Sequence, residues 1–552
     1  MVEHFDAVVV GSGFGGSVMA SRLAESDWSV CVLERGRPYP PGSFARSPYD
    51  MARNAWDPSE GTYGLFDFWA FSGLSSVVSA GLGGGSLIYS NVMLRKDPSW
   101  FVDEDVPGGS SRQWPVDYDD LESHYERVEN RIGVQRYPFD VPPYDATERT
   151  RTLFEAGRSL GLSPILPPLA VTFGNPGRAP VPGQSIEDGE RNLHHAPRST
   201  CRLVAECNLG CNFGSKNSLD FTYLSDAERS NAELRTLCEV RSFERLGDRF
   251  LVNYRQHDTK TTSEFSAERQ VTCSNLVLSA GTFGTTYLLL RNRSAFPMIS
   301  PRLGSRFSGN GDSLGLVVKA KQRTASGSQP RRMRPSFGPA ITAALKVPDN
   351  ADGRGFYIQD AGFPDLFSWM AHQAAPGQVL RLASFMVTQA VARLTNSPRT
   401  NVSSALRTIL GEALLTDSSS SFAGIGSDVP DGCFRLREGF LDLDWTSRRS
   451  RPYFKRVNAT MDGLARALDA RLLTNMLWWL NLLVSVHPLG GCPMASDREH
   501  GVVDATGEVF DCPRLFVADG SVMPGPVGAN PSLTIAALAD RFADALIERG
   551  PA

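Results

Sequence analysis

The first 34 residues constrain the fold of this chain more than any other segment. Residues 7–10 read Ala-Val-Val-Val, which predicts a buried strand, and residues 11–16 read Gly-Ser-Gly-Phe-Gly-Gly. Residues 17–24 predict a helix with small and apolar side chains, and residues 29–33 predict a second strand that ends at Glu34. A strand, a glycine-rich turn, a helix, a strand and an acid in this order predict a dinucleotide-binding unit on a parallel sheet.

Three glycines of this turn have distinct physical roles. Gly11 permits the tight turn, Gly13 lets a pyrophosphate approach the backbone, and Gly16 lets the helix pack closely on the strand. Free amides at the N-terminus of the helix suit a diphosphate. The carboxylate of Glu34 lies where it can accept hydrogen bonds from the ribose of an adenosine. The unit by itself leaves both FAD and NAD open.

Four later segments extend this nucleotide-binding pattern. Residues 79–91 are a second glycine-rich segment, whose backbone can approach a flat or anionic ligand because glycine adds no Cβ. Residues 233–240 predict a strand that frames an adenine, and residues 275–285 predict a strand, a glycine turn and a helix that close the sheet. Residues 515–521 predict a buried strand ending in an acid.

The composition is that of an ordinary globular protein. Of 552 residues, 41% are hydrophobic, and a net charge of -4 without a long Lys or Arg run argues against general nucleic-acid binding. The N-terminus has no features of a secretory signal, so we expect a cytoplasmic protein. The apolar run at residues 476–486 is too short to span a bilayer.

The cysteines predict a reducing compartment, because nine of them are spread thinly over a long chain. Cys201, Cys207 and Cys211 lie close together, which raises the question of a zinc or iron–sulfur site. Their spacing contains no C-x-x-C pair and no obvious fourth ligand adjoins them. We therefore predict packing of a turn and no metal.

The middle of the chain predicts a second domain. Within residues 311–470, strands are expected at 314–320, 355–360 and 440–445, and apolar helices at 365–415. Residues 131–200 are rich in Pro and Gly with little periodicity, which predicts an extended excursion over the surface. Chemistry-bearing motifs return at the C-terminus with His487 and with Asn530, which could cap a helix that has Pro531 in its first turn.

Together these segments resemble the glucose-methanol-choline (GMC) oxidoreductase family, and within it the cholesterol (3-hydroxysteroid) oxidase branch. The pieces that match, in family order, are the N-terminal unit, residues 81–91, the His-Pro-Leu-Gly-Gly-Cys of 487–492, the Ala-Asp-Gly-Ser of 518–521 and the Asn-Pro of 530–531. The resemblance implies an α/β fold in which a Rossmann-like FAD-binding domain is interleaved with a substrate domain. The substrate domain would be an α+β unit built on a mostly antiparallel sheet with helices. The implied cofactor is FAD, bound covalently or non-covalently, and we favour non-covalent binding because the sequence has no recognisable attachment site.

The resemblance also implies a division of the chain. We expect the FAD-binding domain to comprise residues 1–40, 76–110, 198–310 and 484–552, and the substrate-binding or cap domain to comprise residues 41–75, 111–197 and 311–483. The cofactor-binding residues implied are Gly11, Gly13, Phe14, Gly15, Gly16, Glu34, Gly83, Gly84, Gly85, Ser86, Asn91, Val240, Gly281, Asp519, Gly520, Asn530 and Pro531.

The implied reaction is oxidation of an alcohol by hydride transfer to flavin N5. His487 would accept or relay the hydroxyl proton, since an imidazole titrates near neutral pH. Asn530 would bond the substrate oxygen or the flavin edge, and the helix from Pro531 would stabilise the reduced, anionic ring. Asp519 would accept from ribityl or phosphate-side hydroxyls. Asp360 would shift a double bond, in an apolar setting that raises its pKa.

The expected substrate is a bulky hydrophobic secondary alcohol, above all a 3-hydroxysteroid, with O2 or another electron acceptor as the second substrate. Three alternatives stay open: a GMC dehydrogenase for another alcohol with a non-oxygen acceptor, a non-redox flavin lyase or photoenzyme, and a non-catalytic binding protein. The apolar stretches at 365–395 and 472–486 favour a buried core, with transient contact to a membrane surface as the minority interpretation. No oligomeric state is predicted.

Overall fold

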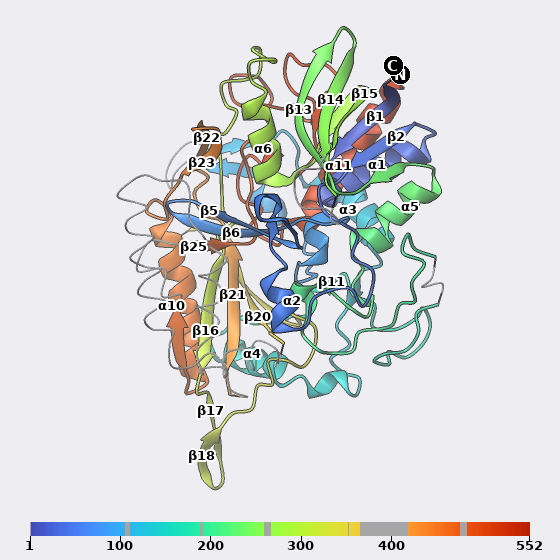
Figure 1. The fold of residues 1–552 in the computed structure, drawn as a ribbon. Coiled ribbons are helices and arrows are strands. Elements are labelled where there is room, and N and C mark those ends of the chain that lie inside the picture. The colour runs from blue at the N-terminus through green and yellow to red at the C-terminus, as the bar shows by residue number, and fades with distance from the viewer. Residues whose placement is uncertain are drawn as a thin grey trace.

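The computed structural model describes residues 2–104, 111–187, 191–258, 267–351, 353–364, 418–474 and 483–551. Two large sheets organise these residues, with a smaller sheet lying between them (Figure 1). The two ends of the chain lie next to each other beside the first sheet (Figure 1). The mixed α/β fold class predicted from the sequence is confirmed.

The first sheet is the predicted nucleotide-binding sheet. Its order is β12-β2-β1-β15-β14-β13, with β26 paired to β15. Four neighbouring pairings are parallel, whereas β13 and β14 form an antiparallel extension. The strands are β1 (Glu3–Val10), β2 (Val30–Leu33), β12 (Glu233–Arg235), β13 (Cys238–Leu246), β14 (Arg249–Gln256), β15 (Ala267–Leu278) and β26 (Leu515–Val517).

Helix α1 (Phe14–Glu25) packs against α5 (Tyr223–Arg229) and α11 (Ser532–Arg549), and α11 packs against α3 (Tyr118–Ile132). The start of α1 approaches the sheet so closely that only glycine fits. A Cβ added to Gly15 would lie 1.5 Å from the carbonyl oxygen of Ala518, and one added to Gly16 would lie 2.0 Å from that of Gly11. This close approach fixes the first turn of α1 at the ends of the strands.

The second sheet is antiparallel throughout, as predicted for the substrate domain, and has the order β10-β19-β20-β21-β16-β24. Its strands are β10 (Ser163–Ile165), β16 (Ser313–Val318), β19 (Ala344–Val347), β20 (Phe356–Ala361), β21 (Ser420–Gly426) and β24 (Arg471–Thr474). Helix α10 (Arg451–Ala467) buries Phe454, Val457 and Met461 in the same core as the sheet, which α4 (Glu148–Ser159) also contacts.

The small third sheet joins distant parts of the chain. Strand β25 (Leu483–Ser485) pairs in parallel with β6 (Leu74–Ser79), which pairs with β5 (Phe66–Ala70). Among the described residues, the other α-helices are α2 (Pro48–Ala52) and α6 (Gly281–Arg291). The other strands form two-stranded pairs: β3 (Trp56–Asp57) with β4 (Thr62–Tyr63), β7 (Val102–Glu104) with β8 (Ser111–Gln113), β9 (Gln135–Arg136) with β11 (Pro168–Leu169), β17 (Lys321–Thr324) with β18 (Gly327–Pro330), and β22 (Cys433–Arg437) with β23 (Phe440–Asp444).

Two local predictions were wrong. Residues 233–240 are not one strand, because the chain turns at Leu237, whose φ is 57°, and β12 and β13 enter the sheet at opposite edges. Residues 131–200 are not only an extended excursion, because α4 lies within them and buries Leu153 and Ala156 in the second core. The helices predicted at 365–415 lie outside the described residues.

The expected domain segments can be compared with the two large sheets. Every strand of the first sheet falls in a segment expected for FAD binding, and every strand of the second sheet falls in a segment expected for the substrate domain. Strands β6 and β25 cross the expected boundaries at residues 75 and 483. The boundaries themselves stay a prediction.

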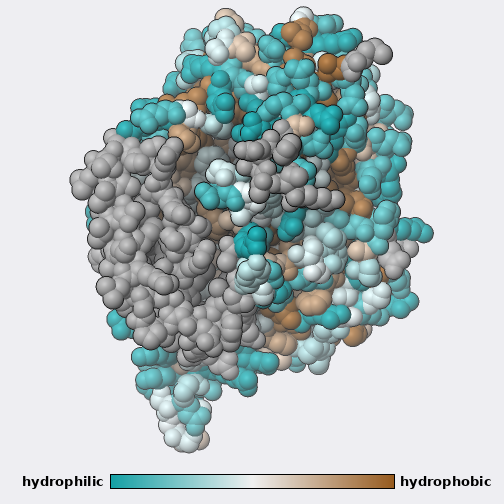
Figure 2. Space-filling view, in the orientation of Figure 1, coloured by the Kyte–Doolittle hydropathy of each residue, from teal (hydrophilic) through white to brown (hydrophobic). Residues whose placement is uncertain are grey.

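In the part of the chain that the structure describes, no helix has the length and hydropathy needed to cross a membrane. The face in Figure 2 carries many hydrophilic side chains. The projecting hairpin β17–β18, at the bottom of this view, is predominantly polar, and all eight residues of its two strands are exposed (Figure 2).

Candidate active site

A cavity of about 820 Å³ opens at the carboxyl ends of the parallel strands. Val10 is in register with both Leu33 and Leu278, and Leu278 is in register with Val517, so four strands end at one level. The residues that follow each strand line the cavity, as expected for the ligand-binding edge of such a sheet. The cavity continues to the second sheet, where Gln359 lines it.

One wall of this cavity is backbone without side chains. A Cβ added to Gly13, Gly85 or Gly281 would meet no atom within 4 Å, and all three residues line the cavity. By contrast, a Cβ on Gly84 would lie 2.6 Å from the Cα of Gly13, which brings the two glycine-rich segments together. Three segments thus leave a cradle open where a diphosphate needs close backbone approach.

Glu34 lies at the nucleotide end of the cavity. It is 5% exposed, and it accepts hydrogen bonds from Ser12 N (3.1 Å), Ser12 Oγ (2.7 Å) and Gly36 N (2.8 Å). A carboxylate has about four acceptor positions, which leaves capacity for a ribose hydroxyl. Val240 and Cys238 of β13 line the cavity beside it. This end suits an adenosine.

His487 lines the other end of the cavity, two residues after the end of β25. Its Nδ1 lies 2.7 Å from Oδ1 of Asp312, and Oδ2 of Asp312 accepts from the backbone N–H groups of Val486 (2.8 Å) and His487 (3.0 Å). The Asp312 side chain is 7% exposed. Because a carboxylate accepts, Nδ1 carries the hydrogen, and Nε2 is left as the nitrogen that can take a proton.

Asn530 lines the cavity and is 5% exposed. Its Oδ1 accepts a hydrogen bond of 2.7 Å from Nε2 of Gln359 on β20, so its Nδ2 remains as a donor. The prediction that Asn530 caps the helix was wrong, because the N-cap residue of α11 is Pro531 and no side chain caps it. The first amides of α11 are therefore not used by a side-chain cap, and Pro531 and Ser532 line the cavity.

Asp519 lies at the cavity wall between the end of β26 and the start of α6. One oxygen accepts from Gly281 N (2.9 Å) and Thr285 Oγ1 (2.5 Å), and the other accepts from Ser521 N (2.9 Å) and Ser521 Oγ (2.6 Å). Burial raises the pKa of Asp519 above its ordinary value, and these hydrogen bonds oppose that shift. The carboxylate thus ties the start of α6 to the end of β26. Its role toward a cofactor hydroxyl stays a prediction.

The apolar setting predicted for Asp360 was wrong. Its carboxylate pairs with Arg149 and accepts from the backbone N–H groups of Thr342 (2.8 Å) and Ala343 (2.8 Å). Both side chains of the pair are 1% exposed. On β20 the neighbours Gln359 and Ala361 line the cavity and Asp360 does not, because successive side chains of a strand point to opposite faces.

Most residues predicted to bind the cofactor line the cavity. They are Gly11, Gly13, Phe14, Gly15, Glu34, Gly84, Gly85, Val240, Gly281, Asp519, Gly520, Asn530 and Pro531. Four others are not among the lining residues: Gly16, Gly83, Ser86 and Asn91. Ser86 instead donates to Gly83 O (2.7 Å) and accepts from Leu219 N (3.0 Å), which holds the second glycine-rich segment in place.

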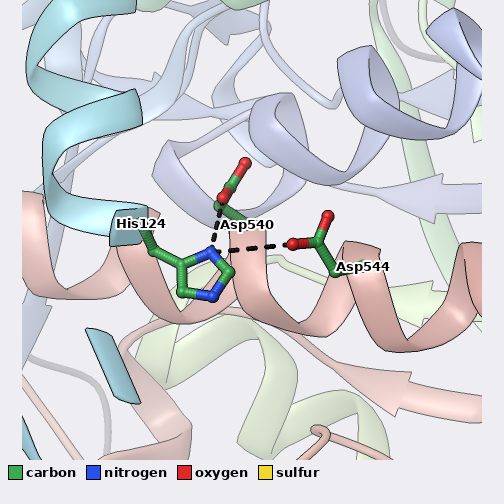
Figure 3. A group of neighbouring side chains, drawn as sticks. All are labelled: His124, Asp540 and Asp544. Atoms are coloured by element: carbon green, nitrogen blue, oxygen red, sulfur yellow. Dashed lines mark hydrogen bonds and ion pairs between the residues drawn. The ribbon is translucent and has the colours of Figure 1, made fainter. Parts of the chain in front are cut away.

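The three neighbouring cysteines do not form a ligand cluster. Cys201, Cys207 and Cys211 are free thiols, and within the described ranges the one group that satisfies ligand spacing is His124, Asp540 and Asp544 (Figure 3). In that group Nδ1 of His124 lies 2.6 Å from Asp540. Asp540 also pairs with Arg22 and Arg127, and Asp544 pairs with the same two arginines. Two guanidinium groups already neutralise these carboxylates, so the arrangement is that of an ion-pair network.

Sequence reasoning missed Asp312 and Gln359. Asp312 lies 175 residues before His487, in a segment without a motif, and the structure brings the two side chains together. Gln359 adjoins Asp360, and the residue that faces the cavity can be chosen only when the register of β20 is known. Burial along β20 gives no alternation that would reveal its cavity face, since five of its six residues are buried.

The cavity fits FAD on the evidence of its own residues. Backbone open to a diphosphate lies between the acid at the adenosine end and the free start of α11 at the other end. The positive end of a long helix suits the region of a flavin that gains negative charge on reduction. Gly13, Gly85 and Gly281 would hold the diphosphate, and Glu34 the ribose.

Comparison with known proteins gives an independent finding. Family models described as GMC oxidoreductase match residues 189–308 and 454–539. A cholesterol oxidase from Mycobacterium tuberculosis is 27% identical, covering 100% of this chain and 92% of that protein. Paromamine 6'-oxidase from Streptomyces fradiae is 26% identical, covering 98% and 91%. The solved structure of pyridoxine 4-oxidase from Mesorbium loti has a TM-score of 0.56 at 17% identity, covering 98% of this chain and 99% of that chain, which is a likeness of fold.

Proposed function

Because the chain belongs to the GMC oxidoreductase family, and is thus an FAD-dependent oxidoreductase of CH–OH groups, we propose that it oxidises a bulky, apolar secondary alcohol of the 3-hydroxysteroid class to the ketone. One observation carries this proposal. The cavity that holds His487 and Asn530 has a floor on the second sheet in which Ala361, Ser421 and Ala423 are small. A match to a cholesterol oxidase over the whole chain supports the same substrate class.

The floor leaves room for a fused-ring skeleton. Ala361 on β20 and Ser421 and Ala423 on β21 line the cavity with short side chains, Ile425 on β21 lines it with a longer apolar one, and Ala361 is in register with Ser421. The three short side chains keep the space beyond Gln359 open. An apolar substrate gains about 25 cal/mol for each Å² of its surface that such a floor removes from water.

The proposed role of His487 follows from its bond to Asp312. The Nδ1–H group donates to the carboxylate, which holds the ring in one tautomer and keeps Nε2 free to take the hydroxyl proton of the substrate. The imidazolium that results lies next to a negative charge, which stabilises it. Asp312 does not need to move, because two backbone N–H groups hold its second oxygen.

Asn530 supplies a hydrogen-bond donor, whereas the imidazole of His487 supplies a proton acceptor. With Oδ1 committed to Gln359, its Nδ2 donates a hydrogen bond toward the substrate oxygen and fixes that oxygen before reaction. When bound, FAD supplies the two-electron acceptor for the hydride of the carbinol carbon. The start of α11 contributes fixed positive partial charge at the same end of the cavity.

The proposal ends at the ketone and does not include isomerisation. A base that moves a proton between ring carbons must face the substrate, and Asp360 is instead held by Arg149 on the other side of β20. Among the described residues of β20 and β21 that line the cavity, none is acidic. The electron acceptor that we propose is O2, because two relatives that match this chain along its length, cholesterol oxidase and paromamine 6'-oxidase, are named as oxidases.

The test is anaerobic mixing of the purified yellow protein with alcohols of different shape. We expect a 3-hydroxysteroid to bleach the flavin band faster than a primary alcohol on an aminoglycoside, and we expect peroxide when air is admitted. Loss of bleaching with every alcohol would point to a lyase or photoenzyme, and bleaching without peroxide would point to a dehydrogenase.

A variant of the cavity floor tests whether the floor binds the substrate skeleton. Ala423→Phe should block the steroid and leave a short secondary alcohol as a substrate, because the added ring fills the floor next to Gln359. Equal rates for both alcohols in this variant would show that the floor does not bind the substrate skeleton.

A further inference from the structure

The segment Ser308–Asp312, called the positioning loop below, contacts His487 and the backbone immediately before Asn530. Asn310 within it is fully buried, with φ of 52°. Its Oδ1 accepts from the N–H groups of Val527 (2.9 Å) and Gly528 (3.0 Å), and its Nδ2 donates to Ala529 O (2.8 Å). One amide side chain thus satisfies three consecutive peptide groups immediately before Asn530.

Two residues further along the same loop, Asp312 holds the other group. Its carboxylate binds the His487 ring and two backbone N–H groups, and it also accepts from Ser485 Oγ (3.0 Å). Ser485 Oγ in turn contacts Gly309 O at 3.2 Å. One connection between the imidazole and the 527–529 backbone therefore runs through Asn310 and Asp312, two residues apart.

The positioning loop is itself anchored by a buried acid. Asp428, which is 3% exposed, accepts from Ser308 Oγ and from the Gly309 N–H group (2.9 Å). Ser308 Oγ also accepts from Asn310 N at 2.9 Å, so the contact with Asp428 is continuous with the residue that holds the 527–529 backbone. Burial, with the nearby charge of Asp312 adding, raises the pKa of Asp428 to about 7.

We propose that the positioning loop fixes His487 and Asn530 relative to each other, and that Asp428 is the residue that holds the loop in shape. Asp428 is a positioning residue, since it acts through Asn310 and Asp312 and does not line the cavity. The inference rests on the proposed function only in assuming that both groups act on one substrate oxygen.

The test is amide hydrogen exchange of the FAD-loaded protein, which needs no substrate. In Asp428→Ala, the peptides that contain residues 527–528 and residues 486–487 should both exchange at least about tenfold faster, because their N–H groups bond to Asn310 and Asp312. In Asn310→Ala, only the first peptide should change. The matched control is Asp431→Ala, three residues away, whose carboxylate lies 3.5 Å from Arg449 and does not contact the loop.

Activity provides the second readout. For Asp428→Ala we expect kcat to fall by roughly 10- to 100-fold with little change in KM, as for misplacement of about 1 Å. Asp428→Asn should restore most of it, because the amide oxygen can accept from Gly309 and the amide N–H can donate to Ser308. If Asp428→Ala does not fold, Ser308→Ala removes one of the two hydrogen bonds between Asp428 and the loop and should show the same two-peptide pattern with a smaller rise.

Each outcome decides the question. Unchanged exchange in both peptides, or an equal rise along the whole chain, overturns the positioning role. A two-peptide pattern in a protein that oxidises no steroid leaves the loop inference in place and removes the substrate proposal alone.

Discussion

The replacement Asp312→Asn tests the proposed chemistry with the smallest change of shape. The new amide can present its oxygen or its nitrogen to His487. Two backbone N–H groups, at 2.8 and 3.0 Å, face Oδ2 of Asp312, and both need an acceptor. The amide oxygen therefore turns to those two donors, and the amide nitrogen turns to Nδ1 of His487.

The imidazole must then accept at Nδ1 and carry its hydrogen on Nε2, the nitrogen that should take the substrate proton. A buried Asp next to a catalytic His, when changed to Asn in a protease triad, lowers kcat by about 10⁴ through this exchange of tautomers. We expect a decrease of about 10³ to 10⁴ in the rate of flavin reduction, equivalent to ~4–5 kcal/mol in activation free energy.

Two measurements check this prediction. Anaerobic rapid mixing with the alcohol gives the rate of flavin reduction, and nitrogen NMR of labelled histidine gives the tautomer of His487. Asp431→Asn serves as the control for loss of a nearby carboxylate. A variant that keeps more than about a tenth of the rate while its Nε2 carries the hydrogen would refute the role of His487 as proton acceptor.

Three further predictions follow from burial and packing. Gly13→Val should fold but purify without FAD, because its side chain enters the open cradle, and the visible absorbance of the purified protein checks this. Gly15→Val should not fold, because its Cβ would lie 1.5 Å from the carbonyl oxygen of Ala518. Asp360→Asn should lower the free energy of unfolding by ~3–5 kcal/mol, seen as a lower unfolding temperature, because Arg149 is left buried without its counter-charge; an unchanged temperature would contradict this. Burial raises the pKa of Asp428 from 3.8 to about 7. Its contribution to the free energy of unfolding is therefore fully present below about pH 4 and is lost as the pH rises through 7, a decrease of ~4 kcal/mol in total. Asp428→Asn has no carboxyl at this position to titrate, so its unfolding temperature relative to the wild type should rise between about pH 5.5 and about pH 8. A constant difference in unfolding temperature between the two proteins over this range would show that Asp428 does not titrate there.

The nucleotide end of the cavity could be predicted from the sequence because its signals are local. Gly11 and Gly15 are required by contacts with neighbouring strand ends, and Glu34 follows its strand directly. A glycine in such a turn reports a close approach whatever the rest of the fold does. The first strands, α1 and the lining role of the glycine-rich turns therefore followed from a few residues each.

The substrate end could be predicted only in part, because its contacts join segments far apart in sequence. His487 and Asn530 stand in motifs, but Asp312 and Asn310 do not, and they reach their partners across 175 and 217 residues. The choice between Gln359 and Asp360 depended on the register of a strand that is buried on both faces, for which a one-residue error reverses every side chain.

The first sheet forms the cofactor end of the cavity and the second sheet forms its floor, and this division bears on the relatives of the chain. The cofactor end is built from backbone at the edge of the parallel sheet, where a change of side chain would block the cradle. The floor consists of side chains on β20 and β21, which can change size while the backbone ladder stays intact. His487 is held through the positioning loop, whereas the Asn530 side chain is bonded to Gln359 on β20 and the loop holds only the backbone before Asn530. A change in the floor at a residue other than Gln359 therefore alters which alcohol fits without removing the hydrogen bonds that hold these two groups. This separation is consistent with full-length matches, at 26–27% identity, to oxidases named for substrates as different as cholesterol and paromamine.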